Sequence, residues 1–318
     1  MSNTLDKEVK NIIPHDSELE EVFGEAHFTE GPTVAPDNTV YFSDITFTHQ
    51  ADMQAGHIMR YHPDSGETSV FRSPSGMSNG MKFDAQGCLV VAEGADFGGR
   101  RIIRTDMDTG KSDIIAGLYE GKPFNSPNDL TIDEQGRIYF TDPRYVGHES
   151  VDQPVMGVYR IDTDGSVHLV IADSGKPNGI AVSPDQKTLY VGSNDSGSLR
   201  EMPEDMPTYT GRMALLAYDL SSDGTATFRE TLVDYHPEHG PDGFEVDAEG
   251  NLYVAVRDKT RFGIGIYSPN GKELTFIPTP ELPTNVAFGR GDLSKVLYIT
   301  AGGSLFRICV SIDGYHLT

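Results

Sequence analysis

The stretch NGIAVSPDQKTLYVGS, residues 178–193, joins two short apolar runs through a polar turn. Runs rich in Val, Ile, Tyr and Leu between turn residues are typical of buried strands. Variants of this phrase recur along the chain, at spacings of 49, 49, 50, 64 and 42 residues. Their first residues are Glu30, Asn79, Asn128, Asn178, Asp242 and, in the weakest copy, Thr284. A period of roughly 40 to 50 residues built from short strands indicates propeller blades.

Each of the first five phrases is followed by a second pair of apolar runs, which a turn dipeptide separates. These dipeptides are Ser65-Gly66, Thr109-Gly110, Asp164-Gly165, Asp223-Gly224 and Asn270-Gly271. A polar residue followed by glycine between two strand-like runs favours a hairpin turn. Two hairpins per repeat make four antiparallel strands, which is one blade. We therefore predict an all-β fold, a six-bladed β-propeller with four antiparallel strands per blade.

The sixth repeat is too short to supply its own fourth strand. After SLFRICVS, residues 304–311, only a few residues remain. The N-terminal stretch LEEVFGEAHF, residues 19–28, is the candidate for the missing strand, and its pairing with the last blade would remove an open sheet edge. Because the repeat runs along the chain without a linker, we predict a single domain over residues 1–318, with 1–17 as an N-terminal extension.

The composition narrows the class of protein. The 318 residues include 48 acidic and 25 basic residues, for a net charge of -23, which argues against nucleic acid or an anionic membrane as a partner. The sequence has no apolar run of membrane-spanning length and no signal-peptide pattern at its start, so a cytoplasmic protein is expected. We expect Cys88 and Cys309 to be reduced core residues. No feature indicates an obligate protein partner.

The residues that open the six phrases are candidates for one shared site. In a propeller the first strand of each blade lies nearest the axis, so these residues should surround the mouth of the axial channel. Oxygen ligands without His or Cys suit a hard divalent cation, whose charge Glu30 and Asp242 would balance. The alternative is that Asn-Gly and Asp-Gly pairs only form tight turns, and we favour that reading for Asn79. Glu30, which precedes Gly31-Pro32, has no such explanation.

Four separated phrases resemble the SMP-30/gluconolactonase/LRE family of six-bladed propellers. They are EGP at 30–32, NSPNDL at 125–130, PNGIAVSPD at 177–185 and PDGFEVDAEGNLYVA at 241–255. The likeness extends from about Glu21 to Gly303 and is greatest to the gluconolactonase branch. It implies a divalent cation held by Glu30, Asn178 and Asp242. It also implies that Asn128 lies beside the cation and touches either the cation or the substrate.

The same resemblance implies a hydrolase that opens a sugar lactone, such as gluconolactone, to its acid. Ca²⁺ is the expected cation, with Mg²⁺, Mn²⁺ or Zn²⁺ as alternatives, and Asp242 would be both ligand and base. Ser126 stands where the animal senescence-marker branch has a substrate-binding Arg. We therefore expect Asn128, Asn125 and Arg101 to contact the substrate, although a plain surface charge is the alternative for Arg101. Hydrolysis of other esters, lactones or phosphotriesters, or a calcium-binding propeller without turnover, remain the alternative functions.

The expected rim of the ring carries two long segments, residues 45–57 and 195–212. We predict that they select the lactone, and the second accounts for the spacing of 64 residues. A neutral, hydroxyl-rich substrate suits a site of amides and carboxylates. No aromatic wall is evident among the residues of the repeated phrases.

Overall fold

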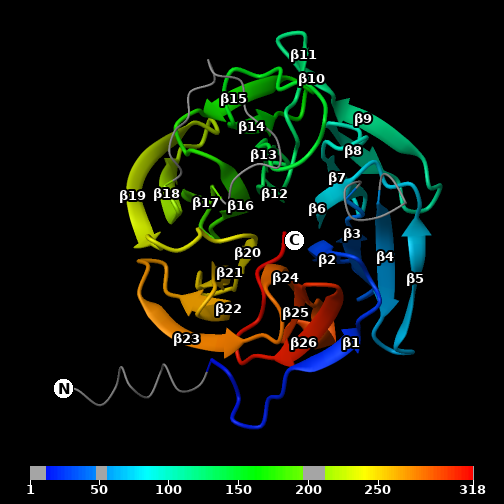
Figure 1. Ribbon diagram of the computed structural model, residues 1–318, viewed down its shortest axis with the longest axis vertical. Helices are drawn as coiled ribbons and strands as arrows, with labels where there is room; N and C mark the ends of the chain where they lie inside the picture. Colours follow the sequence, from blue (N-terminus) through cyan, green and yellow to red (C-terminus); the bar gives the residue numbers. More distant parts are fainter. Residues whose placement is uncertain (1–11, 48–55, 196–211, 318) are drawn as a thin grey trace.

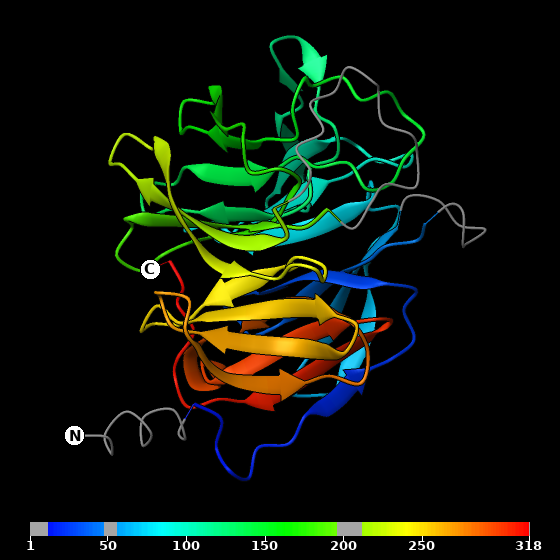
Figure 2. The same cartoon turned by 60° about the vertical axis from the view of Figure 1, so that its left-hand side comes forward.

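The structure is a computed structural model that describes residues 12–47, 56–195 and 212–317. Six four-stranded antiparallel sheets surround one axis, with the first strand of each repeat innermost (Figure 1). Figure 2 shows blade five at the front, in yellow to orange, with blade six behind it in red. The predicted six-bladed β-propeller is confirmed.

The strands follow one another from the axis outward in each blade. Blade one has β2 (Thr29–Val34), β3 (Val40–Asp44), β4 (His57–His62) and β5 (Glu67–Arg72), and blade two has β6 (Ser78–Phe83), β7 (Leu89–Glu93), β8 (Arg101–Thr105) and β9 (Ser112–Ala116). Blade three has β12 (Leu130–Ile132), β13 (Ile138–Thr141), β14 (Val158–Ile161) and β15 (Val167–Ile171), and blade four has β16 (Pro177–Val182), β17 (Thr188–Ser193), β18 (Ala214–Leu220) and β19 (Ala226–Asp234). Blade five has β20 (Phe244–Val246), β21 (Leu252–Asp258), β22 (Arg261–Tyr267) and β23 (Glu273–Pro278), and blade six has β24 (Pro283–Phe288), β25 (Val296–Ala301), β26 (Ser304–Cys309) and β1 (Glu20–Phe23).

The N-terminal strand closes the ring, as the sequence predicts. Strand β1 pairs antiparallel with β26, with Glu20 opposite Arg307 and Glu21 opposite Phe306. The last blade therefore combines three strands from the end of the chain with one from its beginning, which leaves no unpaired strand between the first and last blades.

A few features lie outside the blades. A small hairpin of β10 (Leu118–Tyr119) and β11 (Lys122–Pro123) follows blade two, and a 3₁₀ turn, η1 (Gly291–Leu293), lies in blade six. Both cysteines are free, as predicted, but only Cys88 is buried, and Cys309 is exposed because it ends a strand. No helix in the described residues has the length and apolar character needed to cross a membrane.

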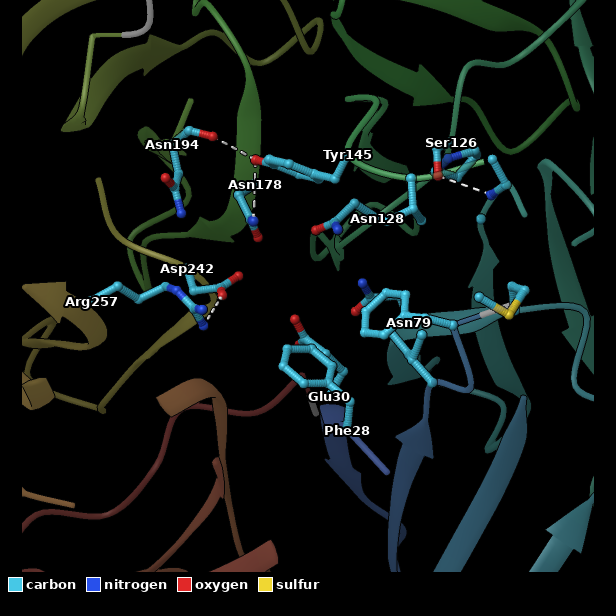
Figure 3. A pocket seen from close by; sticks show the side chains of 17 residues that line it. Phe28, Glu30, Asn79, Ser126, Asn128, Tyr145, Asn178, Asn194, Asp242 and Arg257 are labelled. Carbon is cyan, nitrogen blue, oxygen red and sulfur yellow. Dashed lines mark hydrogen bonds and ion pairs between the residues drawn. The ribbon is translucent and has the colours of Figure 1, made fainter. Parts of the chain in front are cut away.

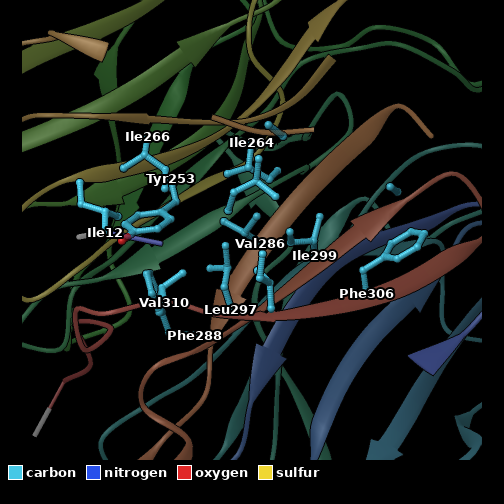
Figure 4. Packing of buried hydrophobic residues seen from close by; sticks show 14 residues of the cluster. Ile12, Tyr253, Ile264, Ile266, Val286, Phe288, Leu297, Ile299, Phe306 and Val310 are labelled. Carbon is cyan, nitrogen blue, oxygen red and sulfur yellow. The ribbon is translucent and has the colours of Figure 1, made fainter. Parts of the chain in front are cut away.

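The core is divided among the gaps between neighbouring blades. Each of the six gaps in the described chain holds its own cluster of buried apolar side chains. Figure 4 shows the cluster between blades five and six, where Tyr253 meets Phe288 edge to face with ring centroids 4.9 Å apart. Because both faces of each sheet are covered, inner strands such as β16 are buried along their whole length.

The first residues of the inner strands form bulges in four blades. The pairing register shifts between Glu30 and Thr33, Ser78 and Met81, Pro177 and Ile180, and Pro283 and Asn285. A bulge leaves extra residues on one strand and redirects a side chain. In these blades a polar residue within the bulge, namely Glu30, Asn79, Asn178 or Asn285, faces the axis.

The glycines that follow these polar residues allow adjacent inner strands to approach each other. Asn79-Gly80 lies inside β6, so the tight-turn interpretation of Asn79 is wrong. The amide of Gly80 donates to the carbonyl of Asn128 in the next blade at 2.7 Å, and a Cβ on Gly80 would overlap the Asp129 carboxylate. A Cβ on Gly243 would likewise overlap the side chain of Asn285. Only glycine permits this distance between neighbouring backbones.

Candidate functional site

The residues that open five of the six repeats meet in one cavity. This cavity has a volume of about 210 Å³ and lies where the inner strands begin. Figure 3 shows the side chains of Glu30, Asn79, Asn128, Asn178 and Asp242 pointing toward a common space. Residues from five different blades are therefore brought together by closure of the ring.

The sixth position does not join them. Thr284 is buried in the sheet, where its hydroxyl donates to the carbonyl of Thr29 at 2.8 Å. The next residue, Asn285, faces the axis instead, and its Nδ2 donates to Asp129 Oδ2 at 3.2 Å. Asp129 thus adds a third buried carboxylate next to the cavity, although it is not among the residues that line it.

The cavity has a strongly acidic environment. Burial raises the pKa of Glu30 well above its usual range, and the carboxylates of Asp242 and Asp129 raise it further. Burial also raises the pKa of Asp242 to about 6, against the opposing effect of Arg257. Among the described residues that line the cavity, Arg257 is the one that carries a positive charge. Buried carboxylates with so little positive charge nearby favour the binding of a cation or of protons.

Several oxygens in the cavity lack a partner. Asn79 Oδ1 and Asp242 Oδ1 are buried and accept no hydrogen bond from the described residues. Within the described part of the chain, the Glu30 carboxylate accepts a hydrogen bond from its own neighbour, the amide of Gly31, at 3.0 Å. Unpartnered buried acceptors are costly, and a hard divalent cation would satisfy them.

The donor set decides which ion fits. In the described part of the chain no group of three or more His, Cys, Asp or Glu side chains forms a metal-binding cluster. The candidate set is instead two carboxylates, Glu30 and Asp242, with the amides of Asn128 and Asn178. Such an oxygen set suits Ca²⁺, Mg²⁺ or Mn²⁺ better than a metal that prefers nitrogen or sulfur.

Tyr145 holds one of the candidate ligands in place. Asn178 Nδ2 donates to the Tyr145 hydroxyl at 3.3 Å, and that hydroxyl donates to the carbonyl of Asn194 at 2.8 Å. The Lys176 ammonium lies 4.9 Å from the centre of the Tyr145 ring. With its NH₂ group directed to Tyr145, Asn178 can direct its Oδ1 into the cavity.

One wall of the cavity is apolar, and its residues come from outside the repeated phrases to which the sequence-based expectation applied. Phe28, Ile45, Phe47 and Met77, from blades one and two, line this side, and the rings of Phe28 and Phe47 lie 5.3 Å apart. These residues lie just outside the repeated phrases, where no local pattern distinguishes a cavity wall from an ordinary core position.

The structure does not bring Asn125 and Arg101 to the cavity. Arg101 Nε donates to the buried Glu93 carboxylate at 2.6 Å, outside the cavity lining. The Asn125 side chain is fully buried, with Nδ2 donating to the carbonyl of Val155 at 3.1 Å and Oδ1 accepting from the amide of Gln153 at 3.1 Å. Both side chains have protein partners, so the predicted substrate contacts are without geometric support.

Two polar residues that were not predicted as substrate contacts line the cavity instead. Arg257 of β21 supplies a guanidinium group within the cavity wall, and Ser126 lines the cavity with its hydroxyl accepting from the amide of Ala95 at 2.9 Å. Arg257 follows the run NLYVAV. The alternation of side chains along this strand is the only signal in the sequence for the direction of the Arg257 side chain. The predicted specificity segments fall largely on residues 48–55 and 196–211, outside the described residues.

The protein is thus a six-bladed propeller with an acidic, oxygen-lined cavity at one end of its axis. Comparison with known proteins identifies the family to which such a propeller belongs. The chain belongs to the SMP-30/Gluconolactonase/LRE-like family, whose model matches residues 28–303. This membership confirms the resemblance seen in the four phrases.

Several relatives of the chain are named as lactonases. A gluconolactonase from Zymomonas mobilis is 31% identical over 325 aligned positions, covering 93% of this chain and 82% of the relative. The pentonolactonase XacC from Haloferax volcanii is 28% identical, covering 86% of this chain and 81% of the relative. The solved structure of a gluconolactonase from Xanthomonas campestris superposes with a TM-score of 0.78 at 27% identity, covering 96% of this chain and 92% of that one. These relatives agree with the predicted class of enzyme.

Proposed function

We propose that this protein is a lactonase that opens a sugar lactone to its hydroxy acid with the help of one divalent cation. The observation that carries the proposal is the meeting of Glu30, Asp242, Asn128 and Asn178 in one cavity that contains unpartnered buried oxygens. Membership of the family and the activities named for its relatives support the lactone as substrate.

Glu30, Asn178 and Asp242, with Asn128 beside them, would hold the cation. Ca²⁺ is the first expectation for this oxygen set, and Mg²⁺, Mn²⁺ and Zn²⁺ are the alternatives. A bound divalent cation supplies polarisation of a carbonyl group and lowers the pKa of a water molecule. The two carboxylates neutralise its charge, while the amides add oxygens without adding repulsion.

Asp242 is the residue best placed to accept a proton. Its Oδ2 is occupied by Arg257 at 2.9 Å, whereas its Oδ1 faces the cavity without a partner among the described residues. In hydrolysis, water adds to the lactone carbonyl, the ring C–O bond breaks, and the released alkoxide takes up a proton. Asp242 would accept the proton from water and return it to that alkoxide. Asn128 lies across the cavity, where its amide can donate to the lactone.

The apolar wall favours a second candidate within the same class. Phe28, Ile45, Phe47 and Met77 offer no hydrogen bond to the hydroxyls of a sugar, but they can pack against C–H groups or an alkyl substituent. A lactone with fewer hydroxyls and an apolar group is therefore the alternative substrate to an aldonolactone.

A panel of lactones tests both candidates. Glucono-1,5-lactone, a pentonolactone and an alkyl-substituted δ-lactone would be assayed by acid release and compared with spontaneous opening in buffer. EDTA should abolish the excess rate, and each divalent cation should restore it to a different degree. If no lactone opens faster than in buffer while the protein still binds Ca²⁺ tightly, a calcium-binding propeller without turnover is the better description.

A further inference from the structure

We infer that Arg257 is a positioning residue that assigns different tasks to the two oxygens of Asp242. It holds Oδ2 in place, so that Oδ1 faces the cavity. The inference rests on the proposed cation site, because it concerns the orientation of the Asp242 carboxylate toward that cation.

Local strand geometry places the guanidinium beside the carboxylate. The amide of Asp242 donates to the carbonyl of Ala255 at 3.0 Å, and the amide of Ala255 donates to the carbonyl of Gly243 at 3.0 Å. Arg257 lies two residues beyond Ala255 on β21 and therefore projects from the same face of the strand. Any residue at this position would be next to Asp242.

A second contact fixes the guanidinium from the neighbouring blade. Arg257 Nη1 donates to Asp242 Oδ2 at 2.9 Å and also to the carbonyl of Pro283, at the start of β24, at 3.0 Å. The side chain is 20% exposed and lines the cavity. A planar guanidinium bound to two blades is a rigid donor, unlike a flexible ammonium group.

This arrangement has two opposing consequences. A fixed donor on Oδ2 orients the carboxylate so that Oδ1, which has two lone pairs, faces the cavity and could contact the cation while accepting a proton from water. The positive charge of Arg257 also repels a divalent cation in the same small cavity. Arg257 would therefore weaken cation binding while it promotes turnover.

Calcium titration and lactone hydrolysis, measured on the same variants, test this inference. Arg257→Met removes both charge and donor. We expect it to bind Ca²⁺ at least about tenfold more tightly, because the repulsion is gone, and to lose about 10²-fold in kcat, because Asp242 is no longer oriented. Arg257→Lys keeps the charge without the two-blade contact, so its Ca²⁺ affinity should resemble that of the parent while its kcat falls.

The matched control is Arg104→Met. Arg104 Nε donates to Asp84 Oδ2 at 2.6 Å in a half-buried ion pair of blade two that does not line the site. Its loss should leave Ca²⁺ affinity and kcat unchanged. Calorimetry and thermal unfolding would show that each variant is folded.

Two results would overturn the inference. If Ca²⁺ affinity and kcat fall together in Arg257→Met, Arg257 only supports the structure. If Arg257→Lys keeps the kcat of the parent, the two-blade contact has no effect on reaction. Absence of Ca²⁺ or any other divalent cation from the unsubstituted protein is a separate result, which would refute the proposed cation site itself.

Discussion

The two ends of the axial channel are built from the same six inner strands but balance their buried charges in opposite ways. Where the strands begin, Glu30 and Asp242 are buried, and Arg257 is paired with Asp242 alone. Where the strands finish, Lys82 of β6 is ion-paired with Glu245 of β20 across the axis. Negative charge is in excess at the first end, whereas at the second end Lys82 and Arg290 accompany the single carboxylate of Glu245.

The second end is also closed by the chain itself. The C-terminal segment, residues 313–317, runs to the centre of the ring (Figure 1) and leaves a cavity of only about 60 Å³. The Tyr315 hydroxyl donates to Glu134 at 3.1 Å, and His316 Nε2 lies 2.8 Å from the carbonyl of Gly289. Burial lowers the pKa of His316 to about 4, which keeps it neutral.

The difference shows which end is built to bind a ligand. A buried polar group must be paired, and the protein completes that pairing at only one end of the channel. The cavity with uncompensated carboxylates and unpartnered oxygens is therefore where we propose that a cation binds.

The largest expected effect is at Asp242. Asp242→Asn keeps an oxygen of similar reach but removes the proton acceptor, so turnover with saturating cation should fall by about 10² to 10⁴. The measurement is kcat at rising Ca²⁺ concentration. Asp164→Asn, in an exposed hairpin turn, is the control and should remain fully active. Complete recovery of Asp242→Asn with excess cation would mean that Asp242 acts only as a ligand.

A variant at the closed end should change stability instead of activity. Glu245→Gln leaves the partly buried Lys82 without its ion-pair partner, which should lower the free energy of unfolding by about 2 kcal/mol. Denaturant unfolding measures this loss, and kcat of the folded variant should equal that of the parent. A large loss of kcat without loss of stability would contradict the proposal that the closed end serves stability and the open end serves activity.

Cation affinity should depend on pH at the open end. Carboxylates must be deprotonated to bind a cation, and burial raises the pKa of Asp242 to about 6 and that of Glu30 well above its usual range. Affinity should therefore fall as pH decreases through about 6, by at most about tenfold per pH unit for each proton displaced. Calorimetry between pH 5 and 8 in buffers of different ionisation enthalpy would show the released protons.

The same raised pKa values determine how the cation-free protein responds to pH. The folded state keeps protons on Asp242 and Glu30 at pH values where the unfolded chain has lost them. The free energy of unfolding should thus fall as pH rises from about 4 through about 6, and saturating cation should reverse this trend. Affinity and stability that stay constant over this range would contradict the acidic description of the site.

The smallest effect is expected in the C-terminal segment. Tyr315→Phe removes the hydroxyl that donates to Glu134 and accepts from Gln186 Nε2 at 3.0 Å. Loss of these partly exposed bonds should cost about 1 kcal/mol of stability, seen as a small decrease in melting temperature, and should leave kcat unchanged. A marked decrease in kcat would mean that the structure of the closed end affects catalysis in the cavity.

Much of the fold could be read from local patterns. The hairpin dipeptides and alternating runs depend on residues close in sequence, and the short sixth repeat requires a strand from elsewhere, which β1 provides. The positions of Glu30, Asn178 and Asp242 also followed from the repeat, because equivalent residues of a closed ring lie around one axis, although Thr284 turns into its sheet. Asn79 was misjudged because an Asn-Gly pair in a bulged strand has the same letters as one in a turn.

The sequence by itself therefore determined the blades, their number and the polar residues at their inner ends, since strand alternation and turn chemistry are local properties. Only the tertiary structure decided that Arg257 enters the cavity while Arg101 pairs with Glu93 outside it, and that Phe28 contributes an apolar wall. These outcomes depend on the direction of single side chains across blade boundaries. That direction is set by bulges, by close approach at glycines and by closure of the ring, which no short stretch of sequence encodes alone.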